Sequence, residues 1–209
     1  MMMYSNLPNF VLGFHGCDAS VADRILMHQD IMRASENDYD WLGPGIYFWE
    51  NNPQRALDYA LMLKDKTSRS RNIIHEPSSI GAVIDLGHCL NLLEQSSLDV
   101  LKRGYEILKI KMEKLGTPMP ENKKGRESES HDLLLRFLDC AVIQSVHEFN
   151  REMGQKAYDS VRGVFFEGNE LYPGAGFRKK DHIQICVINP NCIKGYFKPM
   201  EPLDGYSVP

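Results

Sequence analysis

The stretch GPGIYFW, residues 43–49, carries the strongest local signals for the fold. Two glycines around a proline predict a turn, and the aromatic and β-branched run after it predicts a short strand over residues 46–49. Asn51 or Asn52 can then cap a helix that has Pro53 in its first turn. Four side chains share one face of that helix: Ala56, Tyr59, Ala60 and Leu63.

The chain on either side of this stretch also predicts short strands. Residues 11–15 have the pattern of a strand, and residues 18–28 have helical spacing, with Asp18 and Ser20 as candidate N-caps. Residues 80–86 are apolar and rich in β-branched side chains, which indicates a buried strand.

The middle of the chain is predicted to be helical. Apolar side chains recur at helical spacing over residues 98–112, and residues 133–149 form a second apolar helix pattern. Between them, residues 117–130 are polar and rich in turn formers, which predicts a loop. We expect the two helices to form a packed helical insertion over about residues 95–155.

The last part of the chain returns to strands. Residues 162–167, 182–188 and 192–197 are strand patterns, with an Asn-Pro-Asn turn between the last two. A loop rich in glycine, proline and aromatic residues lies between the first two. Strands at both ends and helices between them predict an α+β fold in one domain, residues 1–209, whose sheet is built from both ends of the chain.

Composition restricts the classes of function. A formal net charge of −4 gives no general electrostatic signal for nucleic acid, and no apolar stretch approaches the length of a membrane span. The N-terminus lacks the pattern of a signal peptide. The five cysteines are spread out and contain no C-x-x-C pair, so we expect neither a disulfide framework nor a metal site. These features predict a soluble, cytoplasmic protein without a membrane partner.

Three segments contain more polar and glycine residues than a core requires. His15-Gly16 combines a ring nitrogen with a backbone that a ligand can approach closely. Tyr47 and Tyr59 lie on the strand and on the helix after it, where two aromatic rings can flank a flat cationic ring. Gln184 is a lone polar residue among aliphatic ones, on the same strand face as His182.

In their order along the chain, these segments resemble ADP-ribosyltransferases of the diphtheria-toxin and poly(ADP-ribose) polymerase branch. Residues 14–17, FHGC, are similar to the W-H-G-S segment of that family, and residues 43–48 to its G-K-G-I-Y-F. Residues 56–59, ALDY, are similar to its S-A-N-Y. The late strand with Gln184 resembles the strand that holds the third catalytic residue. The resemblance covers both ends of the chain and not the helical middle.

The resemblance implies a split β-sandwich and a set of roles in binding NAD. His15, Tyr47 and Gln184 would be the catalytic residues. His15 would bind the adenine-side ribose, and the backbone of Gly16 would hold the nicotinamide amide. Tyr47 and Tyr59 would flank the nicotinamide ring. The loop over residues 170–180 would face the acceptor. The full NAD-binding set implied by the resemblance is His15, Gly16, Gly45, Tyr47, Tyr59, Phe177 and Arg178.

Two departures from the family pattern affect the expected chemistry. Ala56 stands where the family has a serine, which removes one hydrogen bond to the carboxamide. Gln184 stands where many members have glutamate, and a neutral amide is a poor base for activating an acceptor. The resemblance therefore implies a single transfer rather than chain elongation. If the register differs, His182 is the alternative third residue.

The expected function is that of an NAD-dependent glycosyltransferase, a mono-ADP-ribosyltransferase. The sequence leaves the acceptor open between a protein and a nucleic acid, although Arg178, Lys179 and Lys180 lie beside the catalytic strand. Two alternatives stay open, an NAD glycohydrolase and a non-catalytic module that binds NAD or ADP-ribose. By analogy of fold alone, a compact transferase of this kind is typical of toxins or defence effectors, which have an antitoxin or inhibitor as partner.

Overall fold

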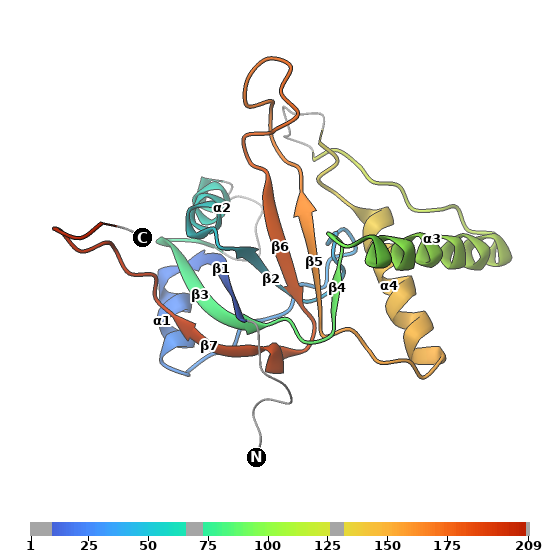
Figure 1. The fold of residues 1–209 in the computed structure, drawn as a ribbon, viewed down its shortest axis with the longest axis horizontal. Coiled ribbons are helices and arrows are strands. Elements are labelled where there is room, and N and C mark those ends of the chain that lie inside the picture. The colour runs from blue at the N-terminus through green and yellow to red at the C-terminus, as the bar shows by residue number, and fades with distance from the viewer. Residues whose placement is uncertain (1–9, 66–72, 126–131, 208–209) are drawn as a thin grey trace.

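The computed structural model describes residues 10–65, 73–125 and 132–207. The N-terminal nine residues, in which we expect no signal peptide, and the end of the polar loop after Gly125 lie outside this part. The chain forms a mixed α+β fold (Figure 1). Its elements are β1 (Phe10–Asp18), α1 (Ala19–Leu26), β2 (Ile46–Glu50), α2 (Pro53–Asp65), β3 (Pro77–Asp85), β4 (Cys89–Asn91), α3 (Gln95–Leu115), α4 (Phe137–Glu152), β5 (Ser160–Phe165), β6 (His182–Val187), the short 3-10 helix Pro190–Cys192 and β7 (Ile193–Phe197).

One seven-stranded sheet has the order β4-β5-β6-β2-β1-β3-β7. The pairing of β4 with β5 is parallel, and all other neighbours are antiparallel. Strands from the two ends of the chain meet where β6 pairs with β2 and where β3 pairs with β7. The prediction of a sheet built from both ends of the chain is therefore confirmed.

The pairing between β1 and β2 is unusually short. Only Gly13 with Glu50 and Phe14 with Trp49 are paired, although β1 continues to Asp18 along β3. The sheet thus consists of a β4-β5-β6-β2 part and a β1-β3-β7 part that are joined over two residue pairs.

Helices cover both faces of the sheet. On one face, α1 contributes Ala22 and Ile25 to a cluster that includes Phe48 and Ile185. On the other face, α4 packs over the β4-β5-β6 part and α2 packs over β1 and β3. Within β6, Ile185 and Cys186 belong to these two different clusters, which confirms the alternation expected for this strand.

Local side-chain signals account for the starts of the first two helices. Asp18 caps α1 by accepting a hydrogen bond from the Ser20 backbone N–H at 3.0 Å. The Asn52 side chain accepts from the Arg55 N–H at 2.9 Å, so Asn52 rather than Asn51 makes the capping bond to α2. Both helices were predicted at these positions, because capping residues next to an apolar pattern define a helix start.

Two expected element starts in the second half of the chain were wrong in detail, and the short strand β4 was missed. The helix expected from residue 133 begins at Phe137, because residues 133–136 are held outside it by a bridge between Leu135 and Lys123. The side chain of Asn122, which is distant in sequence, accepts from the backbone N–H groups of Leu138 and Asp139 in the first turn of α4. The strand β4 was not predicted, since three residues are too few to show alternation. The last strand begins at Ile193 rather than residue 192, after the 3-10 turn.

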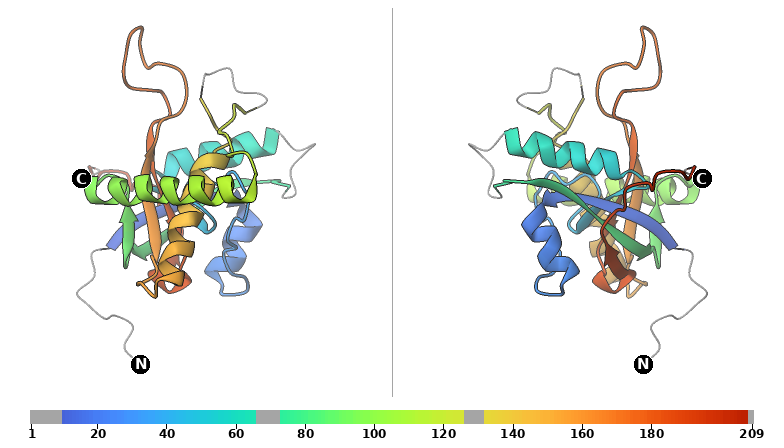
Figure 2. Two further views of the ribbon diagram at one scale, coloured as in Figure 1. Left: turned by 90° about the vertical axis from the view of Figure 1, so that its right-hand side faces the viewer. Right: turned by 90° about the vertical axis from the view of Figure 1, so that its left-hand side faces the viewer.

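The loop between β5 and β6 projects beyond the rest of the protein in every view (Figures 1 and 2). At its base the Asp181 carboxylate accepts from the backbone N–H groups of Glu167 and Arg178. Its tip exposes Tyr172 and Phe177. No helix within the described part of the chain is long and apolar enough to cross a membrane.

Candidate functional site

His15 lies on β1 directly after Phe14, where the pairing of β1 with β2 ends. We call this place the gap between β1 and β2. The ring of His15 bridges the two strands here through one hydrogen bond. Its Nδ1 is 2.8 Å from the backbone oxygen of Tyr47. A carbonyl oxygen only accepts, so Nδ1 carries the proton. Burial lowers the pKa of His15, so the ring is neutral at pH 7 and its Nε2 has a free lone pair. His15 is therefore arranged as a hydrogen-bond acceptor.

Gly16 presents its backbone to the same gap. The Leu12 carbonyl accepts from Asn51 on the β2 side of β1, and backbone groups alternate along a strand. The N–H and C=O of Gly16 therefore point toward β2, but the pairing with β2 has already ended at Phe14. A side chain at Gly16 would overlap the carbonyl oxygen of Ala56, so only glycine allows α2 to lie this close to β1.

The two tyrosines lie in different hydrophobic clusters. Tyr47 packs with the α4 cluster, and its hydroxyl donates to the Gly43 carbonyl at 2.8 Å and accepts from the Leu42 N–H at 3.0 Å. Tyr59 packs on Trp49, with ring centroids 5.0 Å apart. The structure therefore does not bring the two rings face to face in the arrangement expected from the resemblance.

Gln184 is held by Trp41, whose indole N–H donates to the Gln184 Oε1 at 2.6 Å. The same indole packs on Phe165, with centroids 5.0 Å apart. A Cβ at Gly163 would come within 2.8 Å of the Trp41 ring, so this glycine makes room for the indole. Because the amide oxygen of Gln184 faces Trp41, its NH₂ group is turned the other way.

His182 precedes Gln184 by two residues on the same face. Its Nδ1 is 2.6 Å from the Lys180 carbonyl, so Nδ1 is again the protonated nitrogen. The ring stacks on Phe165 and lies 6.1 Å from that of Trp49. Its Nε2 is buried and has no hydrogen-bond partner in the described part of the chain. Burial lowers the pKa of His182, which keeps the ring neutral.

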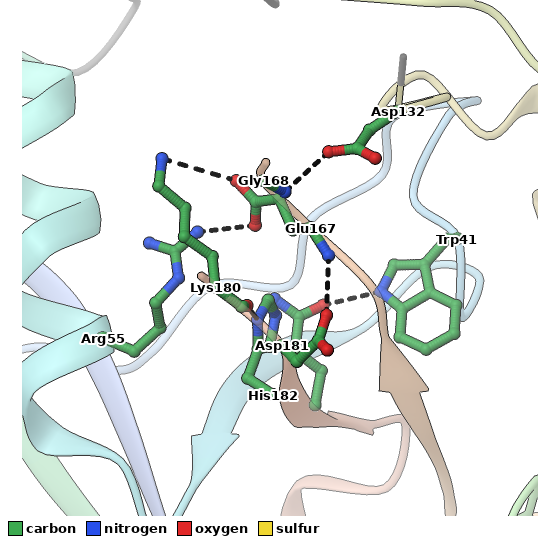
Figure 3. Close-up of polar contacts among 9 residues, drawn as sticks. Trp41, Arg55, Asp132, Glu167, Gly168, Lys180, Asp181 and His182 are labelled. Carbon is green, nitrogen blue, oxygen red and sulfur yellow. Dashed lines mark hydrogen bonds and ion pairs between the residues drawn. The ribbon is translucent and has the colours of Figure 1, made fainter. Parts of the chain in front are cut away.

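A cluster of charged residues joins α2 to the end of β5 above His182 (Figure 3). The buried Arg55 guanidinium donates to Glu167 at 2.6 Å, and the Lys180 ammonium lies 3.9 Å from the same carboxylate. Asp132 accepts from the Gly168 N–H at 2.6 Å and pairs with Arg178. These contacts fix the two ends of the projecting loop against α2 and the segment before α4.

The predicted NAD-binding set also includes Gly45, Phe177 and Arg178. Both backbone groups of Gly45 pair with Ser35, and a Cβ there would overlap the Cys186 sulfur, so Gly45 is needed for packing. Phe177 is 65% exposed on the projecting loop. Arg178 is partly buried at the base of that loop through its pairs with Asp132 and Asp181.

The structure thus brings His15, Gly16 and the backbone of Tyr47 together, and it places Gln184 and His182 on a neighbouring strand. Sequence reasoning missed the residues that hold them, above all Trp41, Arg55 and Glu167. The one local signal for the Arg55 pair is the position of this arginine four residues before Tyr59, beside the apolar face of the helix pattern, where an arginine needs an acidic partner. No group of three or more candidate metal ligands lies together among the described residues.

Comparison with known proteins gives one distant relative. A protein of Methanocaldococcus jannaschii that is described as uncharacterized is 25% identical over 205 residues, which take in 87% of this chain and 83% of that protein. No family model matches the sequence, and no solved structure matches it.

Proposed function

We propose that the protein binds NAD at the gap between β1 and β2 and transfers a single ADP-ribose from it to an acceptor. The observation that carries the proposal is that the backbone of Gly16 has no pairing partner on β2, beside the oriented ring of His15. On this view the two parts of the sheet correspond to the split β-sandwich of the ADP-ribosyltransferases that the sequence resembles.

The backbone of Gly16 suits the nicotinamide end of NAD. A carboxamide has one C=O and one NH₂ group, so it can pair with the N–H and C=O of Gly16 as a neighbouring strand would. Ala56, where the family has serine, lies directly over this glycine and offers no further hydrogen bond. Tyr59, on the same helix, would contact the nicotinamide ring from the α2 side.

The neutral ring of His15 suits a ribose hydroxyl. With its proton on Nδ1 and committed to the Tyr47 carbonyl, Nε2 accepts a hydrogen bond from the sugar. Because burial lowers the pKa of His15, this acceptor persists at pH 7 and is lost only when the ring is protonated at lower pH.

Transfer breaks the bond between the ribose carbon and the nicotinamide nitrogen. Both electrons of that bond stay with the nitrogen, and the ribose gains oxocarbenium character. An acceptor oxygen or nitrogen then bonds to this carbon and loses its proton. Gln184 would hold the ribose through its NH₂ group, but as a neutral amide it neither stabilises the cation strongly nor takes the proton. His182, on the same strand face, is the alternative third residue.

The acceptor is a protein or a nucleic acid that reaches the projecting loop, where Phe177 is exposed beside Arg178. A role as a toxin or defence effector, with an antitoxin or inhibitor as partner, extends this proposal by analogy of fold. The reaction as proposed uses no metal.

The test is to incubate the protein with cell lysate and NAD labelled in its adenylate half. Samples are then treated separately with protease and with nuclease. We expect macromolecular label that one of these treatments removes. The variants His15→Asn and Gln184→Ala should lower the rate at least tenfold. The matched controls His28→Asn and Gln95→Ala change exposed residues of the same types away from the gap.

Other outcomes distinguish the alternatives. Free ADP-ribose and nicotinamide without labelled macromolecules would identify an NAD glycohydrolase. NAD binding without turnover would identify a binding module, an outcome favoured by the neutral Gln184 and its bond to Trp41. Absence of both binding and turnover would contradict the proposal.

A further inference from the structure

A cavity of about 390 Å³ lies between α3 and α4 at the β4 side of the sheet. It is of the size that small-molecule sites have in proteins. Its walls are mainly apolar side chains of the two helices, and Trp41 also lines it. The lining residues used below are Trp41, Leu98, Lys102, Arg136 and Asp139.

Trp41 is a rigid aromatic surface at this cavity. Its N–H is bound to Gln184, its ring edge lies over Gly163, and it packs against Phe165. These three contacts fix the orientation of the indole before any ligand binds. A fixed aromatic ring facing a cavity is a stacking surface for a flat ring, and stacking of a nucleobase on an aromatic side chain stabilises binding by about 1–3 kcal/mol.

The cavity also carries positive charge. Lys102 on α3 and Arg136 at the start of α4 both line it. Asp139, its acidic lining residue, is paired with Arg136 at 3.0 Å. The Arg136 Nε is buried without a hydrogen-bond partner in the described part of the chain. A ligand that has an anionic group would complement Lys102 and Arg136.

We infer that this cavity binds a nucleotide, with the base on Trp41 and the phosphate near Lys102 and Arg136. The site is separate from the gap at His15, and nucleotide binding there does not depend on the proposed reaction. Because Trp41 both lines the cavity and holds Gln184, the bound nucleotide lies one side chain away from the proposed third catalytic residue. The nucleotide can be free or part of a strand.

The test is titration calorimetry without NAD. The probes are AMP, GMP, CMP and UMP, short single-stranded RNA and DNA, and adenosine and inorganic phosphate as half-ligands. We expect at least one mononucleotide or strand to bind more tightly than either half-ligand. Leu98→Trp fills the cavity from an exposed position and should weaken binding at least tenfold, whereas Ile110→Trp, also exposed on α3, should not.

A second pair of variants tests whether the positive charge of Lys102 contributes to binding. Lys102→Glu should weaken binding of a phosphate-bearing probe at least tenfold, and Lys109→Glu on the same helix should not. Both lysines are exposed, so this pair remains informative if Leu98→Trp does not fold. Binding by mononucleotides assigns the site to free nucleotides, and binding by strands alone assigns it to nucleic acid.

Three results would overturn the inference: no binding by any probe, binding that Leu98→Trp and Lys102→Glu leave unchanged, and one-for-one competition by NAD. The last result would make the cavity part of the NAD site. Failure of the inference in calorimetry leaves the labelled-NAD experiment unaffected, so the two proposals fail separately.

Discussion

At the scale of single residues, Asp18 joins two separate parts of the chain. Its carboxylate accepts from the hydroxyl and backbone of Ser20 and from the backbone N–H groups of His75 and Glu76. The hydrogen bond from the Ser20 hydroxyl, followed by that from the Glu76 backbone, holds the pKa of Asp18 well below its usual range. The sequence predicted the N-cap but not the contact with residues 75–76, because a long-range bond leaves no local pattern.

We expect Asp18→Ala to lower the free energy of unfolding at pH 7 by about 1–3 kcal/mol, because it leaves the start of α1 and the backbone N–H groups of residues 75–76 without an acceptor. Since the pKa of Asp18 is depressed in the folded state, its stabilisation is present above the unfolded-state pKa of about 4 and is lost as pH falls below it. Urea unfolding of wild type and variant at pH 7 and pH 3 measures both effects. An equal difference at the two pH values would contradict this assignment.

Gln184 gives a prediction about chemistry. In Gln184→Glu, a carboxylate oxygen still accepts from Trp41, and a negative charge is added where the proposed reaction has the ribose. We expect the rate of ADP-ribose transfer to rise at least tenfold. Single-turnover kinetics with labelled NAD measure this step, and Trp41→Phe, which removes the indole donor, should reduce the gain. An unchanged rate in Gln184→Glu would instead favour His182 as the third residue.

At the scale of elements, the sequence predicted most of the order of strands and helices. It did not predict the ends of those elements whose limits depend on residues far away in the chain. Asn52 determines the start of α2 from an adjacent position, so the prediction was right. The start of α4 depends on Asn122, and β4 depends on its pairing with β5, so both were missed. The same holds for the candidate site. His15 and Gln184 were predicted because their sequence neighbours make them stand out, whereas Trp41 and Arg55 were missed because their partners are far away in sequence.

The close approach of α2 to β1 gives a test at this scale. Gly16→Ala would place a methyl group against the Ala56 carbonyl, and we expect a loss of about 2–4 kcal/mol because backbone must move. Gly176→Ala, where a Cβ meets nothing within 4 Å, should change stability by less than about 0.5 kcal/mol. Chemical denaturation compares the two variants. An equal loss of stability in the two variants would show that the close packing of α2 on Gly16 does not contribute to stability.

At the scale of the whole molecule, the two faces of the sheet are covered by different helices and yet share β2. Phe48 of β2 belongs to the α1 cluster and Tyr47 to the α4 cluster. The helices α3 and α4, expected as an insertion, therefore complete the core on one face. From this arrangement we expect a single cooperative unfolding transition.

The measurement compares one buried isoleucine from each cluster. Ile25→Ala on α1 and Ile143→Ala on α4 should each destabilise by about 2–5 kcal/mol. Both should shift the same transition, seen alike by circular dichroism and tryptophan fluorescence. Two separated transitions, only one of which responds to Ile143→Ala, would mean that the helical part unfolds independently.

The projecting loop between β5 and β6 has one further consequence, for how the protein can diversify. Asp132 and Asp181 fasten its base through backbone N–H groups, and any loop sequence supplies such groups. At its tip, a side chain at Gly176 would meet no other atom within 4 Å. The tip can thus be replaced or lengthened without a cost to the core. In related proteins we expect this segment to vary in sequence and length while the scaffold stays constant.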